Sequence, residues 1–295
     1  METQIIELLQ RVQKVRKPIK RMVRSGEGGE HAVWIIDNAY VLRVPSDVRT
    51  KETLSREEDL LVLIKAVNGK WPYIPECLEV GLFGPLEETA YALYKKVDGV
   101  SIEASPGSIN HATESGLAVV LKHLKSVAER DAKGLGLEDH PEIVPDELRH
   151  AAFNAWSRLY ANDQVKEFAG LDLGEALAMS EEVANARHAP VLLHADFKGE
   201  HIFVDSAGQL TGVIDWSDAC IGHPSIDIGG IAISIGATAA ARVGITAGYS
   251  REIVAKGVFL ARCNLTILLD QLLNGDDDSP EWLVRIQLKR ALEPI

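Results

Sequence analysis

Two aspartates in the window 191–229 have the spacing of a catalytic pair. The window reads as strand, polar loop, short strand, turn, strand and acid, with Asp196 in the loop and Asp215 at the end of the last strand. A turn at 206–209 folds the intervening strands into a hairpin, so we expect the two carboxylates to lie side by side. Such a pair suits phosphoryl transfer, in which the protein mainly positions groups and neutralises charge.

Each aspartate has its own expected role in that chemistry. Asp196 would accept or orient the proton of the acceptor hydroxyl, and Asp215 would hold Mg²⁺ against the phosphates, because magnesium favours oxygen ligands. Lys198 follows Asp196 by two residues and could steady the transferred phosphoryl group; an exposed loop lysine is the alternative interpretation. His194 and Asp227 are expected to brace the loop from beneath rather than to react.

The same window carries a family resemblance. The run HADFKGEH at 194–201 resembles the catalytic loop shared by protein kinases and antibiotic kinases, and residues 214–216 resemble the magnesium-binding acid of that superfamily. In order and length the whole chain resembles the aminoglycoside phosphotransferase family, which segment 222–227 also matches. The likeness is strongest over 191–229, whereas the N-terminal part matches in pattern rather than in letters.

The last position of the catalytic loop departs from the superfamily pattern. It is usually an asparagine that helps to hold magnesium, and here it is His201. A neutral imidazole can ligate a divalent metal, although magnesium prefers oxygen. Histidine at this position resembles the aminoglycoside 2″-phosphotransferases and the macrolide phosphotransferases. We therefore place His201 with Asp215 in the expected metal site and leave open whether the imidazole contacts the metal directly.

The resemblance also implies a place for the triphosphate in the N-terminal part. Arg43 stands where protein kinases have a strand lysine, and a guanidinium can bind phosphate oxygens bidentately. Glu57 or Glu58 of the following helix would pair with Arg43. The alternatives are an outward-facing strand arginine and solvated helix charges.

Two further segments are assigned to nucleotide binding. The glycine-rich turn at 25–30, with Gly28 and Gly29, would cover the phosphates because glycines let backbone N–H groups approach closely; the same glycines are also typical of an ordinary hairpin turn. The resemblance places the hinge between the lobes at the end of the following sheet, where the backbone would bind the purine. The hinge residues are Tyr94, Lys95, Lys96 and Val97.

The remaining chain must position these groups. Periodicity predicts strands at 19–23, 32–36, 39–44, 78–83 and 90–97, and helices at 3–15, 51–66, 112–132, 147–160 and 172–188. We therefore predict an α+β, bilobal, protein-kinase-like fold. A small, mostly β N-terminal lobe would span 1–97, and a larger, mostly helical C-terminal lobe would span 98–295.

Composition limits the partners. The chain has 295 residues, 46% of them hydrophobic, and a net charge of −12, which argues against nucleic acid or anionic membranes as partners. The charge would suit a cationic small substrate, although solubility alone would also explain it. Three scattered cysteines predict neither zinc nor disulfides. Without a signal peptide or an apolar run of about 18 residues, we expect a cytoplasmic protein.

Together these patterns predict a magnesium-dependent kinase. It would transfer the γ-phosphoryl group of ATP or GTP to a hydroxyl of a small molecule, with an aminoglycoside in first place. A macrolide kinase, a metabolic kinase of the same fold and a non-catalytic nucleotide-binding scaffold are the alternatives. The sequence leaves open the acceptor, the choice of nucleotide and the oligomeric state.

Overall fold

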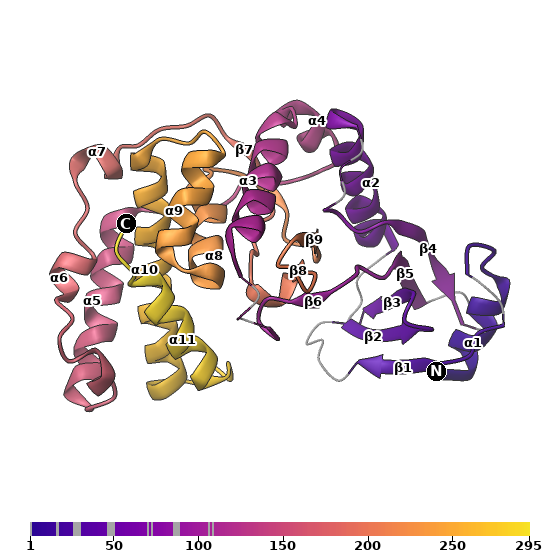
Figure 1. Cartoon of the computed structure of the whole chain (residues 1–295), viewed down its shortest axis with the longest axis horizontal. Coiled ribbons are helices and arrows are strands. Elements are labelled where there is room, and N and C mark those ends of the chain that lie inside the picture. Colours follow the sequence, from indigo (N-terminus) through magenta and orange to yellow (C-terminus); the bar gives the residue numbers. More distant parts are fainter. Residues whose placement is uncertain are drawn as a thin grey trace.

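A mainly β part at the N-terminus and a larger helical part at the C-terminus make up the molecule (Figure 1). The structure is a computed structural model that describes residues 2–15, 18–25, 31–45, 51–69, 71, 73–84, 89–105, 107 and 109–295. For His31, Lys51, Thr53 and Asn68 it describes the backbone alone. The division into a small β part and a larger helical part agrees with the predicted fold class.

A five-stranded antiparallel sheet in the order β1-β2-β3-β5-β4 forms the N-terminal part. Successive strands pair as neighbours except where β5 lies between β3 and β4, so the strand that leads towards the helical part is central rather than at an edge. The strands are β1 (Met22–Ser25), β2 (His31–Ile36), β3 (Tyr40–Pro45), β4 (Cys77–Phe83) and β5 (Thr89–Lys95).

The turn between β2 and β3 explains where the first strand begins. Asp37 and Asn38 have φ values of 50° and 52°, the left-handed conformations that a two-residue hairpin turn requires. The Asp37 carboxylate accepts hydrogen bonds from the backbone amides of Lys20 and Arg21, at 2.9 and 2.6 Å. These residues are therefore bonded to the turn rather than to the ladder, and β1 begins later, at Met22, than the sequence predicted.

One helix covers each face of this sheet. α1 (Glu2–Arg11) buries its apolar stripe against one face in a hydrophobic core of its own. α2 (Lys51–Asn68) covers the other face, where it packs with Ala92 and Tyr94. Arg43 pairs with Ala92 across β3 and β5, and directly paired residues share a face of the sheet. The Arg43 side chain therefore points towards α2.

Helices form most of the remaining chain, and α8, α9 and α11 pack around the long α10 (Figure 1). Among the described residues, no helix combines the length and the apolar character that crossing a bilayer requires. The helices are α3 (His111–Ser126), α4 (Glu129–Gly134), α5 (Pro145–Ala161), α6 (Leu173–Ala176), α7 (Glu181–Ala184), α8 (Ser225–Ile235), α9 (Ala237–Thr246), α10 (Arg251–Asn274) and α11 (Glu281–Ala291), with 3₁₀ turns at Lys166–Phe168 and Gly199–His201.

Two predicted helices are interrupted. The helix predicted at 112–132 ends as α3 because Val127 and Ala128 are extended, with ψ values of 126° and 128°, before α4 begins. The helix predicted at 172–188 is the two short helices α6 and α7. Asp172 and Ser180 each accept a backbone N–H three residues on, and such N-caps begin new helices rather than continue an old one.

Two small sheets complete the C-terminal part: one lies between the N-terminal sheet and the helices, and the other lies beside α3 (Figure 1). β8 (Ile202–Val204) and β9 (Leu210–Val213) form the predicted hairpin, and β6 (Val100–Ser101) pairs with β8. β7 (Val191–Leu193) pairs with β10 (Cys220–Gly222). The loop after β7 and the end of β9 are therefore held close together.

Candidate active site

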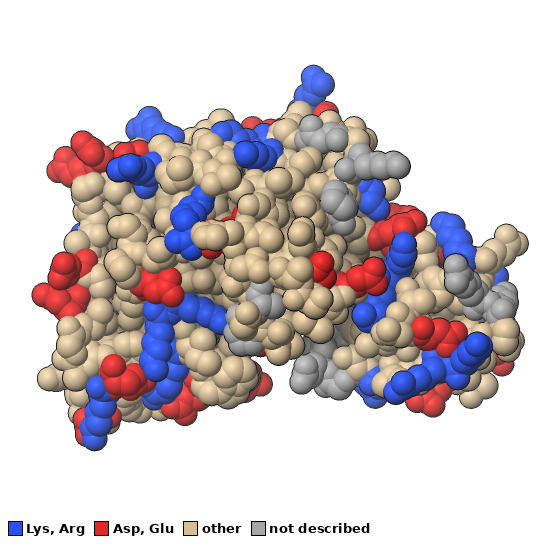
Figure 2. Space-filling model, in the orientation of Figure 1, with Lys and Arg blue, Asp and Glu red and all other residues tan. Residues whose placement is uncertain are grey.

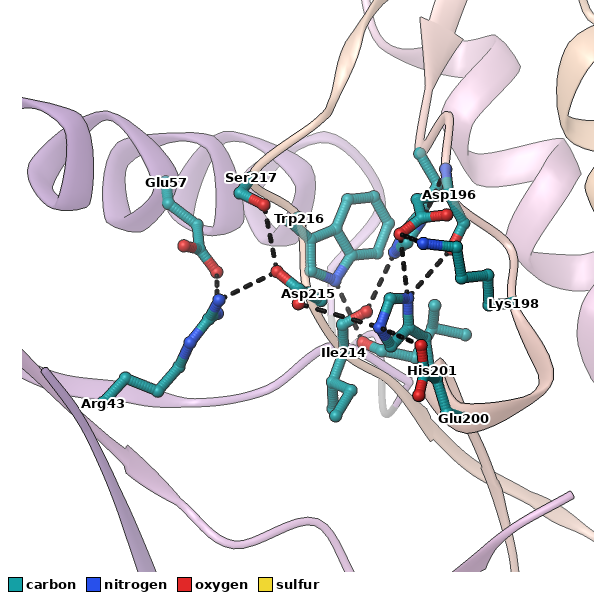
Figure 3. A network of polar contacts seen from close by, with 12 residues as sticks. Arg43, Glu57, Asp196, Lys198, Glu200, His201, Ile214, Asp215, Trp216 and Ser217 are labelled. Carbon is teal, nitrogen blue, oxygen red and sulfur yellow. Dashed lines mark hydrogen bonds and ion pairs between the residues drawn. The ribbon is translucent and has the colours of Figure 1, made fainter. Parts of the chain in front are cut away.

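The two predicted aspartates face the same small region, with His201 between them (Figure 3). The Nδ1 atom of His201 lies 3.4 Å from Oδ2 of Asp196, and its Nε2 atom lies 3.7 Å from Oδ2 of Asp215. His201 comes from the 3₁₀ turn that joins the loop of Asp196 to β8. The hairpin thus brings together the loop acid, the strand-end acid and the histidine, as the sequence predicted.

Both acids are associated with left-handed backbone. Ala195, which precedes Asp196, has a φ of 65°, and Asp215 itself has a φ of 64°. A non-glycine residue in a strained conformation costs about 1–3 kcal/mol and persists only where its surroundings hold it. Asp227 of α8 holds Ala195 in this conformation, since its buried carboxylate accepts hydrogen bonds from the amides of Ala195 and His194 at 2.8 and 3.0 Å.

Asp227 is an unusual acid because it is enclosed. Burial raises its pKa to about 7, although the two backbone N–H bonds favour the charged form. No basic side chain contributes to the pKa of this carboxyl. Asp227 therefore acts on the loop through its hydrogen bonds rather than through an ion pair, the bracing role expected from the sequence.

His194 links the backbone of Asp196 to the backbone of Ile214, the residue before Asp215, by hydrogen bonds. Its Nε2 donates to the carbonyl of Ile214 at 3.0 Å, and its Nδ1 accepts the amide of Asp196 at 3.2 Å. Complete burial, with a smaller effect from His201, lowers the pKa of His194 to about 3. The ring is therefore neutral and works as a structural bridge under the site.

One oxygen of the Asp215 carboxylate accepts two hydrogen bonds, and the other oxygen faces His201. Its Oδ1 accepts hydrogen bonds from Nη2 of Arg43 at 2.9 Å and from Oγ of Ser217 at 3.0 Å. Burial opposes ionisation, but the charge and the hydrogen bond of Arg43, with the hydrogen bond of Ser217, outweigh it and lower the pKa of Asp215 to about 2. Sequence reasoning missed Ser217, whose only signal was a hydroxyl two residues after the acid.

Arg43 connects the N-terminal sheet to this acid. Its Nη1 lies 3.2 Å from Oε1 of Glu57, and Arg43 and Glu57 are 9% and 6% exposed. The register that the sequence left open is thus settled: Glu57, not Glu58, pairs with Arg43. Burial raises the pKa of Glu57 against the charge of Arg43. α2 is therefore connected to Asp215 through Arg43.

Lys198 points back at the loop acid. Its Nζ lies 3.2 Å from Oδ2 of Asp196, and its side chain is 56% exposed whereas that of Asp196 is 17% exposed. Burial lowers the pKa of Lys198, but the Asp196 carboxylate outweighs that effect and raises it above the ordinary value. A cation thus stands at the open side of Asp196.

A row of aromatic rings, which the sequence did not predict, runs from α3 to the loop that carries Asp196. Trp71, in the connection between α2 and β4, stacks on His123 of α3 with ring centroids 5.0 Å apart. Its edge meets Trp216 at 6.1 Å, and Trp216 in turn contacts His194 at 4.6 Å. The residue after Asp215 is therefore packed between rings from both parts of the molecule.

The other predicted nucleotide-binding residues are less informative. Gly28 and Gly29 lie outside the described residues. The amides of Lys95 and Lys96 donate to the carbonyls of Glu76 and Ala39, each at 2.9 Å, so these two hinge N–H groups are engaged within the protein. The remaining hinge residues are Tyr94, whose side chain is buried, and Val97, whose carbonyl accepts Nζ of Lys96 at 3.3 Å. The role of the hinge in purine binding stays a prediction.

A divalent ion fits between Asp215 and His201 on chemical grounds. Within the described part of the chain, no group of three or more histidine, cysteine or acidic side chains is arranged to hold a metal. Mg²⁺ in nucleotide sites typically takes one or two protein ligands, with the rest from phosphates and water, at about 2.0–2.1 Å. Two ligand atoms 3.7 Å apart can touch one such ion.

The comparisons with known proteins place the chain in a family. Residues 23–257 match the phosphotransferase enzyme family, so the chain belongs to that family. It is 24% identical to the hygromycin-B 4-O-kinase of Escherichia coli over 224 residues, which are 72% of this chain and 62% of that kinase. It is also 24% identical to the viomycin phosphotransferase of Streptomyces vinaceus over 214 residues, 70% of this chain and 71% of that protein.

Solved structures show the same fold. The GDP complex of wild-type aminoglycoside 2′-phosphotransferase-IIIa matches with a TM-score of 0.68 at 20% identity, covering 99% of this chain and 97% of that one. Macrolide 2′-phosphotransferase type I matches with a TM-score of 0.58 at 18% identity, covering 98% and 96%. These likenesses confirm the predicted kinase-like fold.

Proposed function

We propose that the protein is an antibiotic kinase that transfers the γ-phosphoryl group of a nucleoside triphosphate to a hydroxyl group, with aminoglycosides as the first candidate acceptors. The observation that carries the proposal is the meeting of Asp196 and Asp215 around His201, at 3.4 and 3.7 Å from the two ring nitrogens. Membership of the phosphotransferase enzyme family supports it. A separation of the two acids to opposite sides of the molecule would have excluded it.

Asp196 is the proposed partner of the acceptor hydroxyl. A group that takes a proton must reach it within hydrogen-bond distance, and the carboxylate of Asp196 is partly exposed in the loop after β7. The hydroxyl proton would pass to an oxygen of Asp196 as the hydroxyl oxygen attacks the γ-phosphorus, and the bond between that phosphorus and the β–γ bridging oxygen would break to release the nucleoside diphosphate. Lys198, 3.2 Å from that carboxylate, would balance the negative charge of the phosphoryl group in flight.

Arg43 and Asp215 are proposed to receive the triphosphate. Arg43 is the cation of the N-terminal sheet that already reaches across to Asp215, and its planar guanidinium suits phosphate oxygens. The pKa of about 2 keeps Asp215 charged at neutral pH. A magnesium ion held by Asp215 and His201 would neutralise charge on the phosphates. Gly28, Gly29 and the hinge residues Tyr94 to Val97 remain candidates for the phosphates and the purine.

The choice of a cationic acceptor rests on where the charge lies. Residues 98–295 contain 29 acidic and 16 basic residues, a net charge of −13, whereas residues 1–97 carry a net charge of +1. In Figure 2 acidic side chains lie along the outer edge of the helical part, interspersed with basic ones. A negative field of this kind attracts ligands that carry amino groups.

The names of the relatives favour antibiotic acceptors. The two curated relatives act on hygromycin B and viomycin according to their names, and structures of similar fold include an aminoglycoside 2″-phosphotransferase with kanamycin. We propose in addition that the lobes divide near residue 97, because β6 directly after it pairs with β8 of the catalytic hairpin. A cytoplasmic location would supply the nucleotide.

A phosphorylation screen tests this proposal. Wild-type protein with Mg²⁺ is offered aminoglycosides, macrolides and common hydroxylated metabolites, each with ATP and with GTP, and transfer is followed by mass spectrometry of the acceptor. The expected result is a product 80 Da heavier with at least one aminoglycoside. Transfer to macrolides alone would show that the acceptor is a macrolide rather than an aminoglycoside. Nucleotide binding without any transfer would support the non-catalytic scaffold. Asp196→Ala is the inactive control.

A further inference from the structure

The hydrogen bonds of His201 fix which of its nitrogens can meet a metal. Nδ1 lies 3.0 Å from the backbone carbonyl of Asp196, and a carbonyl oxygen only accepts hydrogen bonds, so Nδ1 carries the proton. In the neutral ring, Nε2 is then left with a lone pair. Nε2 faces Oδ2 of Asp215 and Oε1 of Glu200, each at 3.7 Å. The His201 side chain is 11% exposed, so the packing around it holds this orientation.

The partners of Asp215 leave its other oxygen for the same place. Oδ1 already accepts from Arg43 and Ser217, so Oδ2 is the oxygen turned towards Nε2 of His201 (Figure 3). The protein therefore offers an ion one carboxylate oxygen and one imidazole nitrogen. An asparagine at position 201 would offer a second oxygen instead.

This donor pair has a consequence for which ion binds best. Magnesium strongly prefers oxygen ligands, whereas affinity for imidazole nitrogen rises along the first-row transition metals. We infer that His201 tunes the divalent-ion site towards Mn²⁺ relative to Mg²⁺, compared with the same site carrying an amide oxygen. The inference rests on the proposed function, since it concerns the ion that accompanies the nucleotide.

The test compares three proteins that differ by a single side chain. They are wild type, His201→Asn, and His150→Asn, which makes the same chemical change on the exposed face of α5. Mn²⁺ and Mg²⁺ affinities are measured by titration calorimetry in the presence of ADP. Pulsed electron paramagnetic resonance of bound Mn²⁺ then reports directly coordinated nitrogen, in protein with ordinary histidine and with ¹⁵N-labelled histidine.

The expected result is a nitrogen coupling in wild type and His150→Asn that changes with the ¹⁵N label and disappears in His201→Asn. The ratio of Mn²⁺ to Mg²⁺ affinity should fall about tenfold in His201→Asn alone. Absence of nitrogen coupling in wild type would overturn the inference, even if His201→Asn did not fold. An unchanged affinity ratio in a folded His201→Asn would also overturn it.

Failure of the proposed function gives a different outcome. If wild-type protein showed the nitrogen coupling but transferred phosphate to no acceptor, the metal preference would stand and the kinase proposal would not. If wild-type protein transferred phosphate while Mn²⁺ showed no nitrogen coupling, the kinase proposal would stand and the role of His201 in ion choice would be wrong.

Discussion

The two acids of the site are held in opposite ways. Asp196 depends on the C-terminal part alone, because the backbone before it is fixed by Asp227 of α8. Asp215 depends on both parts, because Arg43 of β3 binds its carboxylate and Glu57 of α2 in turn binds Arg43. The comparison shows that the loop of Asp196 is positioned by contacts within the C-terminal part, whereas the surroundings of Asp215 also include the N-terminal sheet.

The largest effect should come from removing the acid that is held within one part. Asp196→Ala should lower turnover by about 10²–10⁴-fold, the usual contribution of a proton-transfer group, while nucleotide affinity changes little. Steady-state kinetics measure the turnover, and calorimetry with ADP measures the nucleotide affinity. Near-normal turnover in the folded variant would show that another group accepts the proton.

Removing Arg43, which connects the N-terminal sheet to Asp215, should chiefly lower the free energy of unfolding. Arg43→Met removes the counter-charge of Glu57, which is buried, and an unpaired buried charge costs about 3–5 kcal/mol. Urea unfolding should report a loss of that order. The double variant Arg43→Met, Glu57→Gln should recover much of it, and a failure to recover would mean that the pair itself is not the source of the loss.

Asp227, which holds the backbone before Asp196, should make the free energy of unfolding decrease as pH rises. The pKa of Asp227 is raised to about 7 in the folded protein, so its contribution to stability is full below its unfolded pKa and is lost as pH rises through about 7. Relative to Asp227→Asn, the free energy of unfolding of wild type should therefore fall with rising pH, by at most about 1.4 kcal/mol per pH unit. Urea midpoints at several pH values for both proteins measure it.

That prediction is a difference between two proteins because a second buried group acts in the opposite direction. The lowered pKa of His194, about 3, makes stability increase with rising pH below its unfolded pKa. His194 is present in both proteins, so its effect cancels in the comparison. A wild-type curve parallel to that of Asp227→Asn would contradict the raised pKa.

The smallest effect should come from Ser217, the local partner of Asp215. Ser217→Ala removes one hydrogen bond from a hydroxyl to the charged carboxylate while Arg43 keeps the other, so the loss should be about 1.5 kcal/mol, the low end for a bond to a charged group. It should appear as weaker binding of the Mg²⁺–nucleotide complex with little change in metal-free nucleotide binding. Ser217→Thr, which keeps the hydroxyl, is the matched control. Equal loss in both variants would assign the effect to packing.

The parts of the site that are local in sequence were predictable, and the parts joined by folding were not. The loop, hairpin and strand-end acid follow one another within 191–229, so turn and strand patterns were enough to bring Asp196 and Asp215 together. Arg43 and Asp215 are 172 residues apart, and only the family resemblance related them. Trp71 had no signal at all, because its partners His123 and Trp216 lie on distant segments.

Smaller errors have local causes. One step along a helix turns a side chain by about 100°, so the choice between Glu57 and Glu58 required the placement of α2 against the sheet. The predicted helix at 172–188 was divided because Asp172 and Ser180 cap separate turns. Periodicity records apolar spacing but not these hydrogen bonds.

The position of Trp71 gives the molecule an optical sensor of its own. An indole ring stacked on one side chain of the helical part and edge-on to another has an emission that depends on how the sheet is seated. Any ligand that draws the sheet and the helices together, or parts them, must alter the surroundings of that ring. The emission of Trp71, one of the five tryptophans of the chain, can therefore report the arrangement of the two halves in solution.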